Sequence, residues 1–230
     1  VKRCGFEPVL TSRYVTTPSC SFYAKEINYL GALVITASHN HFNWLGLKIK
    51  NFKGCSVDES FTAGIEKRLE LGNLIYKIEG SYEIADVKKL HLERIKSFFD
   101  IDFIYRSLKK MNMKIFIDSM HGSAARCIDE IFDCNDIEVI QEIRYNADPF
   151  FGGNPPEPLI NYLENLTEKL AINRENGVKT LGIVFDGDGD RVGLVTNEGE
   201  IIFPDKILMM FSCLLYTSPS PRDQRGSRIA

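Results

Sequence analysis

The sequence predicts an α/β protein made of two tandem α/β domains whose sheets are mixed or parallel. Over residues 113–185, short apolar runs alternate with helical patterns in the order strand, helix, strand, helix, strand. This alternation is typical of a parallel sheet covered by helices. An earlier apolar, β-branched run at Leu33–Thr36 indicates a sheet in the first part of the chain as well. With 230 residues, of which 44% are hydrophobic and 26% charged, the chain has enough apolar mass for a sizeable core.

The first part of the chain is expected to contain one strand and three helices. Leu33–Thr36 is predicted to be a buried strand because its residues are mostly apolar. A helix over Ser19–Leu30 follows Thr17 and Pro18, and proline is favoured in the first turn of a helix. Three apolar side chains are expected on its inner face: Phe22, Ile27 and Leu30.

Two more helices are expected before the second domain begins. The first is Ser60–Leu71, and its apolar residues recur at helical spacing. These residues are Phe61, Ile65 and Leu69. The second is Asp86–Phe99, and the chain is expected to cross into a new domain near residues 93–105.

The second part of the chain is expected to hold strands, helices and one irregular segment. Its predicted strands are Lys114–Asp118, Glu138–Ile143, Leu181–Phe185 and Val192–Val195. Its predicted helices are Ala124–Phe132 and Leu159–Asn173. Met120–Ser123 is expected to form a turn, and Asp148–Pro158 to be irregular because it is rich in Gly and Pro.

Charge and composition argue against several classes of protein. The formal net charge of −3 gives no reason to expect binding to nucleic acid or to an anionic membrane surface. No apolar run approaches the roughly 20 residues that a membrane-spanning helix needs. The chain has six cysteines but no CxxC pair, so the sequence gives no support for a zinc site or a dithiol redox site. These cysteines are expected to be reduced, mostly buried thiols of a cytoplasmic protein. The sequence indicates no oligomeric state.

An acidic segment, DGDGDR at residues 186–191, follows the predicted strand Leu181–Phe185, where open α/β sheets bind ligands. Its three carboxylates are those of Asp186, Asp188 and Asp190. They repel one another unless a cation holds them together, and the intervening glycines allow a tight turn. Such oxygen ligands suit Mg²⁺, with a phosphate oxygen completing the coordination, and Arg191 could hold that phosphate or brace the loop. Because predicted strands flank the segment on both sides, a solvated acidic hairpin turn stays open as the structural alternative.

A second polar segment, TASHN at residues 36–40, also follows a predicted strand, so Ser38 is expected at the tip of a sheet. Ser38 beside His39 could be a hydrolase nucleophile, but the G-x-S-x-G pattern is absent and no Asp is identified to complete a triad. Alternatively, Ser38 could carry a phosphoryl group whose charge is balanced by a metal ion and by Lys48. Taken alone, a Ser-His pair in a loop is usually structural.

Together, the two segments resemble those of the α-D-phosphohexomutase superfamily, which includes phosphoglucomutase, phosphomannomutase and phosphoglucosamine mutase. The family's phosphoserine loop reads TASHNP followed closely by NG-x-K, and this chain has TASHNHFNWLGLK at residues 36–48. The family's metal loop, DGDGDR, is present without change. Five residues match the serine loop in register: Ser38, His39, Asn40, Gly46 and Lys48. The Thr17-Pro18 pair and the FGG…PEP segment add support, so the resemblance covers nearly everything from Val9 to Ser212.

The resemblance implies a phosphotransfer that interconverts hexose 1-phosphate and hexose 6-phosphate. Ser38 would be phosphorylated in the active enzyme and would donate its phosphoryl group to a hexose phosphate substrate. The hexose 1,6-bisphosphate so formed, as intermediate and activator, would turn over in the cleft before Ser38 takes back the other phosphoryl group. Mg²⁺ would be held by four residues: Ser38, Asp186, Asp188 and Asp190.

The resemblance also implies roles for the neighbouring side chains. Lys48 is the candidate general acid/base near the sugar hydroxyl. His39 is a candidate catalytic residue that contacts phosphate or shapes the serine loop, with a purely structural histidine as the alternative. Asn40 and Arg191 are candidates for binding substrate or phosphate.

Family members have four domains around one cleft, so the resemblance implies that this chain is a truncated part of that architecture. Residues 1–92 would be domain I without its N-terminal strand, 93–203 domain II, and 204–212 a stub of domain III. Residues 213–230 are expected to be a non-native tail, because Cys213–Asp223 resembles a translated sequencing adapter. Such a piece is expected to be inactive by itself, and it does not identify the hexose, since the sugar-specificity loop belongs to the third domain.

Two positions depart from the family pattern. His41 stands where the family has proline, and Leu45 stands where asparagine is common before Gly46. Replacing proline removes a constraint on φ and is expected to loosen the serine loop. These departures keep a second function open, a Mg²⁺-dependent phosphosugar-binding module without catalysis.

Overall fold

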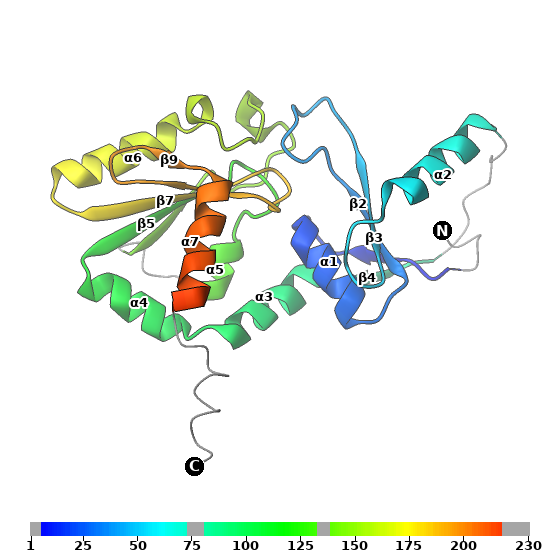
Figure 1. The fold of residues 1–230 in the computed structure, drawn as a ribbon, viewed down its shortest axis with the longest axis horizontal. Coiled ribbons are helices and arrows are strands. Elements are labelled where there is room, and N and C mark those ends of the chain that lie inside the picture. Colours follow the sequence, from blue (N-terminus) through cyan, green and yellow to red (C-terminus); the bar gives the residue numbers. More distant parts are fainter. Residues whose placement is uncertain (1–5, 73–80, 133–138, 218–230) are drawn as a thin grey trace, which may run out of the picture.

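The computed structural model describes residues 6–72, 81–132 and 139–217. In the second part of the described chain, five strands form one mixed sheet in the order β6-β5-β7-β8-β9 (Figure 1). The strands are β5 (Met113–Asp118), β6 (Ile140–Ile143), β7 (Lys179–Phe185), β8 (Val192–Val195) and β9 (Ile201–Ile202). β6, β5 and β7 run parallel, whereas β7, β8 and β9 are antiparallel neighbours. The predicted α/β class with parallel and mixed sheets is confirmed.

Helices cover both faces of this sheet (Figure 1). On one face, Leu166 and Leu170 of α6 (Glu164–Glu175) are fully buried in a cluster with residues of β5, β7 and β8. On the other face, Leu108 of α4 (Ile101–Lys110) packs in a second cluster with Ile115 and Ile117. Each such side chain removed from water stabilises the fold by roughly 1.5–3 kcal/mol. The sheet is therefore a rigid base for the turns at its carboxyl edge.

Two predicted helices in this part have different bounds in the structure. The helix expected over Ala124–Phe132 begins as α5 at Cys127 and ends at Phe132. Arg126 has a φ of 65°, which a continuous right-handed helix excludes, and its backbone N–H donates to Glu142 instead. The helix expected over Leu159–Asn173 begins as a 3₁₀ turn at Ile160–Tyr162 before α6. Part of one predicted strand, Glu138, lies outside the described residues.

The first part of the described chain contains two small sheets and three helices. β1 (Val9–Thr11) pairs in parallel with β4 (Glu83–Ala85), and β2 (Gly31–Ile35) pairs antiparallel with β3 (Leu47–Asn51). The helices are α1 (Thr17–Glu26), α2 (Glu59–Glu70) and α3 (Val87–Phe98). Asp58 and Asp86 cap α2 and α3 with their side chains, which is why the predicted starts of these helices lie within a residue of the observed ones.

Two burial expectations for the first part were wrong. The strand at residues 31–35 is covered on one side only: Val34 is 7% exposed, whereas Leu33 and Ile35 are 57% and 73% exposed. α1 ends four residues earlier than predicted because Asn28 has a φ of 58°. Ile27 and Leu30 are therefore exposed, and the buried residues of α1 are Thr17, Ser19 and Ala24.

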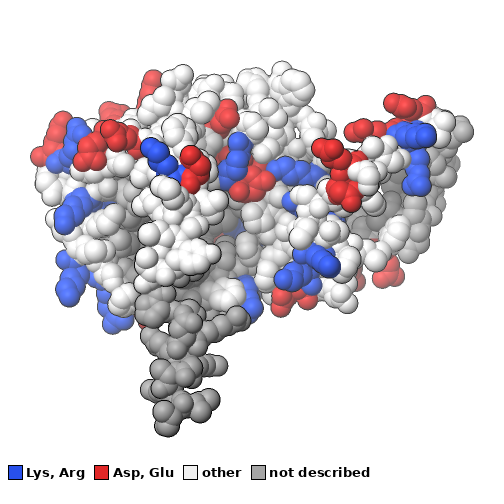
Figure 2. All heavy atoms as spheres, viewed as in Figure 1, with Lys and Arg blue, Asp and Glu red and all other residues white. Residues whose placement is uncertain are grey.

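The last described helix, α7 (Pro204–Thr217), crosses the predicted boundary at residue 213 without a break. Residues 218–230, the rest of the predicted tail, lie outside the described residues. Several large apolar side chains of α7 are exposed, and Figure 2 shows few charged atoms over this helix. These side chains are Leu208, Met209, Met210, Phe211 and Leu214. Of the helices described, none has the length and apolar content to cross a membrane.

The expectation of mostly buried thiols is also wrong for the described cysteines. Cys55 and Cys213 are exposed, and Cys20 and Cys127 are half-buried. All four are free thiols. Cys4 and Cys134 lie outside the described residues.

His91, which packs against α1, is expected to make the free energy of unfolding depend on pH. His91 of α3 has its Nδ1 2.8 Å from Ser19 Oγ and stacks on Phe22. Burial lowers the pKa of His91 below the ordinary histidine value of about 6.5. The folded state therefore binds this proton less readily than the unfolded state, so stability is lost as pH falls from about 6.5 towards the lowered pKa.

We expect the His91→Asn variant to lose less stability than the natural chain when pH falls from about 7.5 to about 5.5. Asparagine retains a hydrogen-bonding group near Ser19 but does not titrate in this range. Urea denaturation of both proteins at the two pH values measures the difference. Equal losses of unfolding free energy in the two proteins would contradict the prediction.

Candidate active site

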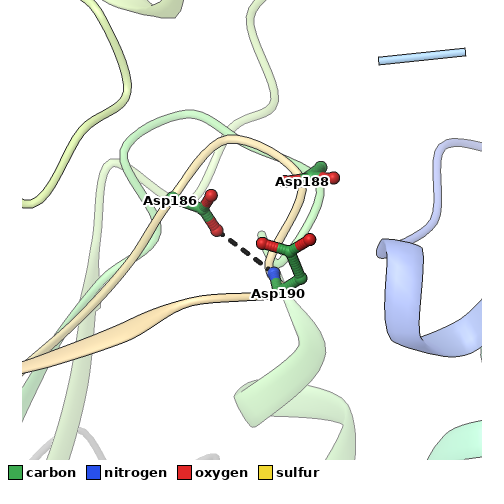
Figure 3. A group of neighbouring side chains, drawn as sticks. All are labelled: Asp186, Asp188 and Asp190. Atoms are coloured by element: carbon green, nitrogen blue, oxygen red, sulfur yellow. Dashed lines mark hydrogen bonds between the residues drawn. The ribbon is translucent and has the colours of Figure 1, made fainter. Parts of the chain in front are cut away.

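The acidic segment forms the turn between β7 and β8, as in the hairpin of the structural alternative. Asp186 and Asp188 are buried, however, so the turn is not solvated as that alternative expected, and its three carboxylates converge. One oxygen from each of Asp186, Asp188 and Asp190 lies within 4.8 Å of the others. Asp186 Oδ1 accepts hydrogen bonds from the backbone N–H groups of Asp190 and Arg191, both at 3.1 Å (Figure 3 shows the first). The turn is thus folded around a carboxylate that is fully buried.

Glycine lets this turn approach the serine loop closely. A Cβ on Gly187 would lie 2.4 Å from the carbonyl oxygen of Ser38 and 2.7 Å from Pro156 Cγ. The Gly187 N–H donates to the carbonyl of Pro156 at 3.2 Å. Any larger residue would push the acidic turn away from Ser38, so glycine is required here by the contact between the two loops.

Ser38 lies in the turn after β2 with its hydroxyl directed at the acidic turn. Its Oγ is 3.1 Å from Asp188 Oδ1 and 3.4 Å from Asp186 Oδ2. Ser38 has a φ of 56°, and its N–H donates to Thr36 Oγ1 at 2.8 Å. A left-handed conformation at a non-glycine residue costs about 1 kcal/mol or more and persists only where its surroundings enforce it. The contacts of Ser38 Oγ with Asp186 and Asp188 hold the hydroxyl in this direction.

Lys48 lies on β3 and balances part of the acidic charge. Its Nζ is 2.6 Å from Asp188 Oδ2, 2.7 Å from Asp190 Oδ2 and 3.5 Å from Ser38 Oγ. Partial burial lowers the pKa of Lys48, but the hydrogen bonds to the two aspartates outweigh this, and the pKa is raised. Lys48 is therefore a protonated amine within reach of the serine hydroxyl.

The pKa values of two carboxyl groups of the turn are shifted in opposite directions. Burial raises the pKa of Asp186, and the hydrogen bonds from Arg191 oppose this effect without cancelling it. Burial also disfavours the charged form of Asp188, but hydrogen bonds from Lys48 and Thr17 outweigh it and lower the pKa of Asp188. Asp188 is thus held as a carboxylate, the form that ligates metal ions.

Arg191 points back into its own turn. Its Nε donates to Asp186 Oδ2 at 2.9 Å, while its Nη2 is buried and has no hydrogen-bond partner among the described residues. A buried guanidinium N–H without a partner is costly, and an anion such as phosphate would satisfy it. The arrangement allows both uses expected for Arg191, bracing the loop and holding a phosphate.

His39 and Asn40 lie beside Ser38 but make other contacts. His39 Nε2 is 3.8 Å from Glu157 Oε1, and its Nδ1 is buried without a partner among the described residues. Asn40 Nδ2 donates to the carbonyl of Ala37 at 3.0 Å, which closes the serine turn. In the described structure neither side chain is hydrogen-bonded to Ser38 or to the acidic turn, so their expected roles towards phosphate stay predictions.

Thr17 is a site residue that the sequence reasoning missed. Its side chain is 2% exposed, and its Oγ1 donates to Asp188 Oδ2 at 2.5 Å. Its backbone N–H donates to the carbonyl of Asp188 at 2.9 Å. The available signal was the Thr17-Pro18 pair, which marks a helix start and supports the family resemblance but does not by itself indicate a contact with the acidic turn.

The donor set fits a hard divalent cation. Three carboxylates and the Ser38 hydroxyl supply oxygen ligands only, which is the set that Mg²⁺ prefers. The three negative charges face two positive ones, Lys48 and Arg191, so one negative charge is left over within this group. A cation here would offset that charge and the repulsion within the turn.

Known proteins with matching sequence belong to one enzyme family. Residues 1–73 match the family model for phosphoglucomutase/phosphomannomutase, alpha/beta/alpha domain I, and residues 89–199 match the model for domain II. A phosphomannomutase/phosphoglucomutase of Pseudomonas syringae pv. tomato is 31% identical over 198 residues, which are 86% of this chain and 40% of that protein. Human phosphoglucomutase-1 is 26% identical, with 89% of this chain and 41% of the human protein covered. The chain thus spans about 40% of the length of these relatives.

Structure comparison gives the same result. A solved structure from Thermus thermophilus, provisionally named a phosphomannomutase, has a TM-score of 0.77 and 27% sequence identity. The match covers 92% of this chain and 47% of that one. By sequence, a phosphoglucosamine mutase of Caldicellulosiruptor bescii is also similar, at 27% identity, with 86% of this chain and 42% of that protein covered. The relatives are thus named after different sugars: mannose, glucose and glucosamine.

Proposed function

Since the chain belongs to the phosphoglucomutase/phosphomannomutase family through its domains I and II, we propose that it is part of a phosphohexomutase acting through a phosphoserine at Ser38. The whole protein would interconvert hexose 1-phosphate and hexose 6-phosphate in the cytoplasm, with hexose 1,6-bisphosphate as the intermediate. One observation supports this most directly: Ser38 Oγ lies 3.1 Å from Asp188, beside three converging carboxylates. A serine hydroxyl next to a cation site is suited to accepting and donating a phosphoryl group.

In this proposal Ser38 is the residue that carries the phosphoryl group. When the group passes to a sugar hydroxyl, the bond between Ser38 Oγ and phosphorus breaks and a bond between the sugar oxygen and phosphorus forms. The sugar hydroxyl loses its proton, and the serine oxygen regains one. The contacts of Ser38 Oγ with Asp186 and Asp188 keep this oxygen directed at the cation site, which favours transfer by positioning the reacting group.

Lys48 is the group best placed to handle these protons. Its Nζ is 3.5 Å from Ser38 Oγ, and its raised pKa keeps it protonated at neutral pH. It can therefore donate a proton to the serine oxygen as the bond to phosphorus breaks and, once neutral, accept the proton that the attacking sugar hydroxyl loses. The resemblance implies the same acid/base role.

The remaining charged groups would bind and orient the reacting phosphate. Asp186, Asp188 and Asp190 would hold Mg²⁺, which when bound offsets the negative charge on the transferring group. The buried Nη2 of Arg191 can donate to a phosphate oxygen. His39 Nδ1, also buried without a partner in the described chain, is a second candidate donor, and Asn40 keeps the serine turn closed.

The hydrolase alternative has little support in this geometry. A Ser-His hydrolase needs the histidine within hydrogen-bond reach of the nucleophilic serine, as its general base. Ser38 Oγ is bonded to carboxylates and to Lys48, and no hydrogen bond joins it to His39 among the described residues. His39 instead faces Glu157.

The two departures from the family pattern lie away from these contacts. Leu45 is 81% exposed, and His41 Nδ1 is hydrogen-bonded to Asn43 Oδ1 at 2.9 Å. The turn after His41 still closes, since the Thr36 N–H donates to the carbonyl of Gly46 at 3.0 Å. The departures therefore give no reason to expect loss of transfer, and a binding module without catalysis becomes one outcome of the test below.

The test uses the longer protein that contains this chain. We expect it to interconvert the 1- and 6-phosphates of glucose, mannose or glucosamine when Mg²⁺ and glucose 1,6-bisphosphate are supplied, and to stop when EDTA removes the metal. Intact-mass analysis should then find one phosphoryl group on Ser38. Binding of hexose phosphate without turnover of any of the three sugars, and without phosphate on Ser38, would favour the binding module.

A further inference from the structure

We propose that Thr17 of the first domain is a positioning residue for the cation site, because its hydroxyl holds one oxygen of Asp188 and thereby turns the other towards Ser38. The inference rests on the proposed function for the existence of the site. It concerns a residue outside both loops that carry the resemblance, and the contact joins positions 171 residues apart in the chain.

The start of α1 places Thr17 against the acidic turn. Thr16 is the N-cap residue, its side chain accepts from the N–H of Ser19, and Pro18 lies in the first helical turn. The N–H of Thr17 is among those that have no partner within the helix, and the carbonyl of Asp188 accepts it at 2.9 Å. The acidic turn therefore caps the helix, and the helix in return fixes the backbone of Asp188.

The side chains complete a second bond between the same two residues. Thr17 Oγ1 donates to Asp188 Oδ2 at 2.5 Å, and both side chains are almost entirely buried. Threonine has few accessible χ1 rotamers, so this donor is held in one direction. Two bonds from one residue, through backbone and side chain, determine both the position and the rotation of the Asp188 carboxylate.

This rotation decides which oxygen of Asp188 is available for a cation. Oδ2 accepts from both Thr17 and Lys48, which fills its two lone-pair directions. Oδ1 accepts only from Ser38 Oγ, at 3.1 Å, in the described structure. Oδ1 is therefore the oxygen free to ligate a metal ion shared with Ser38.

Thr16, the residue before Thr17, contacts another part of the acidic turn. A Cβ on Gly189, which has a φ of 66°, would lie 2.8 Å from Thr16 Cγ2. The acidic turn thus fits against the methyl group of Thr16 while Asp188 bonds to Thr17. The first turn of α1 is in this way one wall of the cation site, built by a different domain from the one that supplies the carboxylates.

The experiment compares Thr17→Val with Thr17→Ser in the chain as it stands. Valine retains the shape of threonine without the donor, whereas serine retains the donor without the methyl group. We expect Thr17→Val to weaken Mn²⁺ binding, measured by calorimetry, by about 10- to 100-fold, as loss of a group that orients a ligand does elsewhere. Thr17→Ser is expected to bind Mn²⁺ within a few-fold of the natural chain. The EPR spectrum of bound Mn²⁺ should differ between the valine and serine variants.

Thr180→Val is the matched control. Thr180 is also buried, and its Oγ1 donates to Asn197 Oδ1 over the same 2.5 Å, but away from the acidic turn. The Thr180→Val variant should lower the free energy of unfolding about as much as Thr17→Val does, and it should leave Mn²⁺ affinity unchanged. If Thr17→Val does not fold, Thr17→Ala makes the same comparison with a smaller side chain.

Three results would overturn the inference, and they are distinguishable. Equal Mn²⁺ affinity of the valine variant and the natural chain overturns the positioning role alone. A serine variant as weak as the valine variant also overturns it, because the hydroxyl would then not be the cause. Failure of the natural chain itself to bind Mn²⁺ overturns the proposed cation site, and the positioning role with it.

Discussion

Replacing Ser38 by alanine is expected to abolish phosphoryl acceptance and to lower mutase turnover of the longer protein by roughly three to six orders of magnitude. No other hydroxyl is hydrogen-bonded to both Asp186 and Asp188 in the described structure. Intact-mass analysis after incubation with glucose 1,6-bisphosphate and Mg²⁺ should find no added phosphoryl group. A coupled assay of hexose 6-phosphate formation measures the turnover.

Two further variants make this result specific. Ser97→Ala removes an exposed hydroxyl on α3 and should be phosphorylated and active like the natural protein. Ser38→Gly should be as inactive as Ser38→Ala but more stable by about 1 kcal/mol, because glycine adopts the positive φ of this position without strain. Phosphate retained by the alanine variant would show that another residue carries the group.

Replacing Asp188 by asparagine is expected to weaken divalent cation binding by at least about 100-fold, or about 2.8 kcal/mol. The change removes a charge from the centre of the acidic turn, where Asp188 faces Ser38 through one oxygen and Lys48 through the other. Without metal, we expect a loss of stability of about 1–3 kcal/mol, because the buried Asp188 side chain loses its ion pair with Lys48. Calorimetric titration with Mn²⁺ and urea denaturation measure the two effects.

The control for this variant is Asp102→Asn. Asp102 lies exposed in the first turn of α4, so the substitution removes the same charge from the chain without touching the acidic turn. Its Mn²⁺ affinity should equal that of the natural chain. An Asp188→Asn variant that still binds Mn²⁺ with natural affinity would mean that the cation is held elsewhere.

The fold could be predicted at many elements with strong local signals, although the helix α4 was not predicted. The alternation over residues 113–185 predicted the parallel part of the sheet because β5 and β7 contain short apolar runs and β6 has an isoleucine at each end, with helical segments between the strands. The strands β1 and β4 were missed because each has only three residues and no pattern of its own. β3 was missed because lysines interrupt its apolar residues. The burial of Leu33–Thr36 was wrong because exposure depends on what packs against a strand, which the strand itself does not encode.

The site was predictable as two segments but not as one arrangement. DGDGDR and TASHN each carry a composition that suits an ion or a phosphoryl group, and each follows a strand. The resemblance implied that they meet. The structure adds three features that neither segment reveals by itself. Ser38 has a strained φ, and one oxygen of Asp188 accepts hydrogen bonds from both Thr17 and Lys48. His39 lies against Glu157.

The sequence by itself determined the α/β class, the helix starts at capping residues and the chemical character of the two loops. These depend on interactions within a few residues, so a local pattern is enough to specify them. Only the tertiary structure decided which oxygen of Asp188 faces Ser38, 150 residues away, and that the first turn of α1 restrains it. Those features depend on how two domains pack, and packing between distant segments is set by the shapes of whole surfaces.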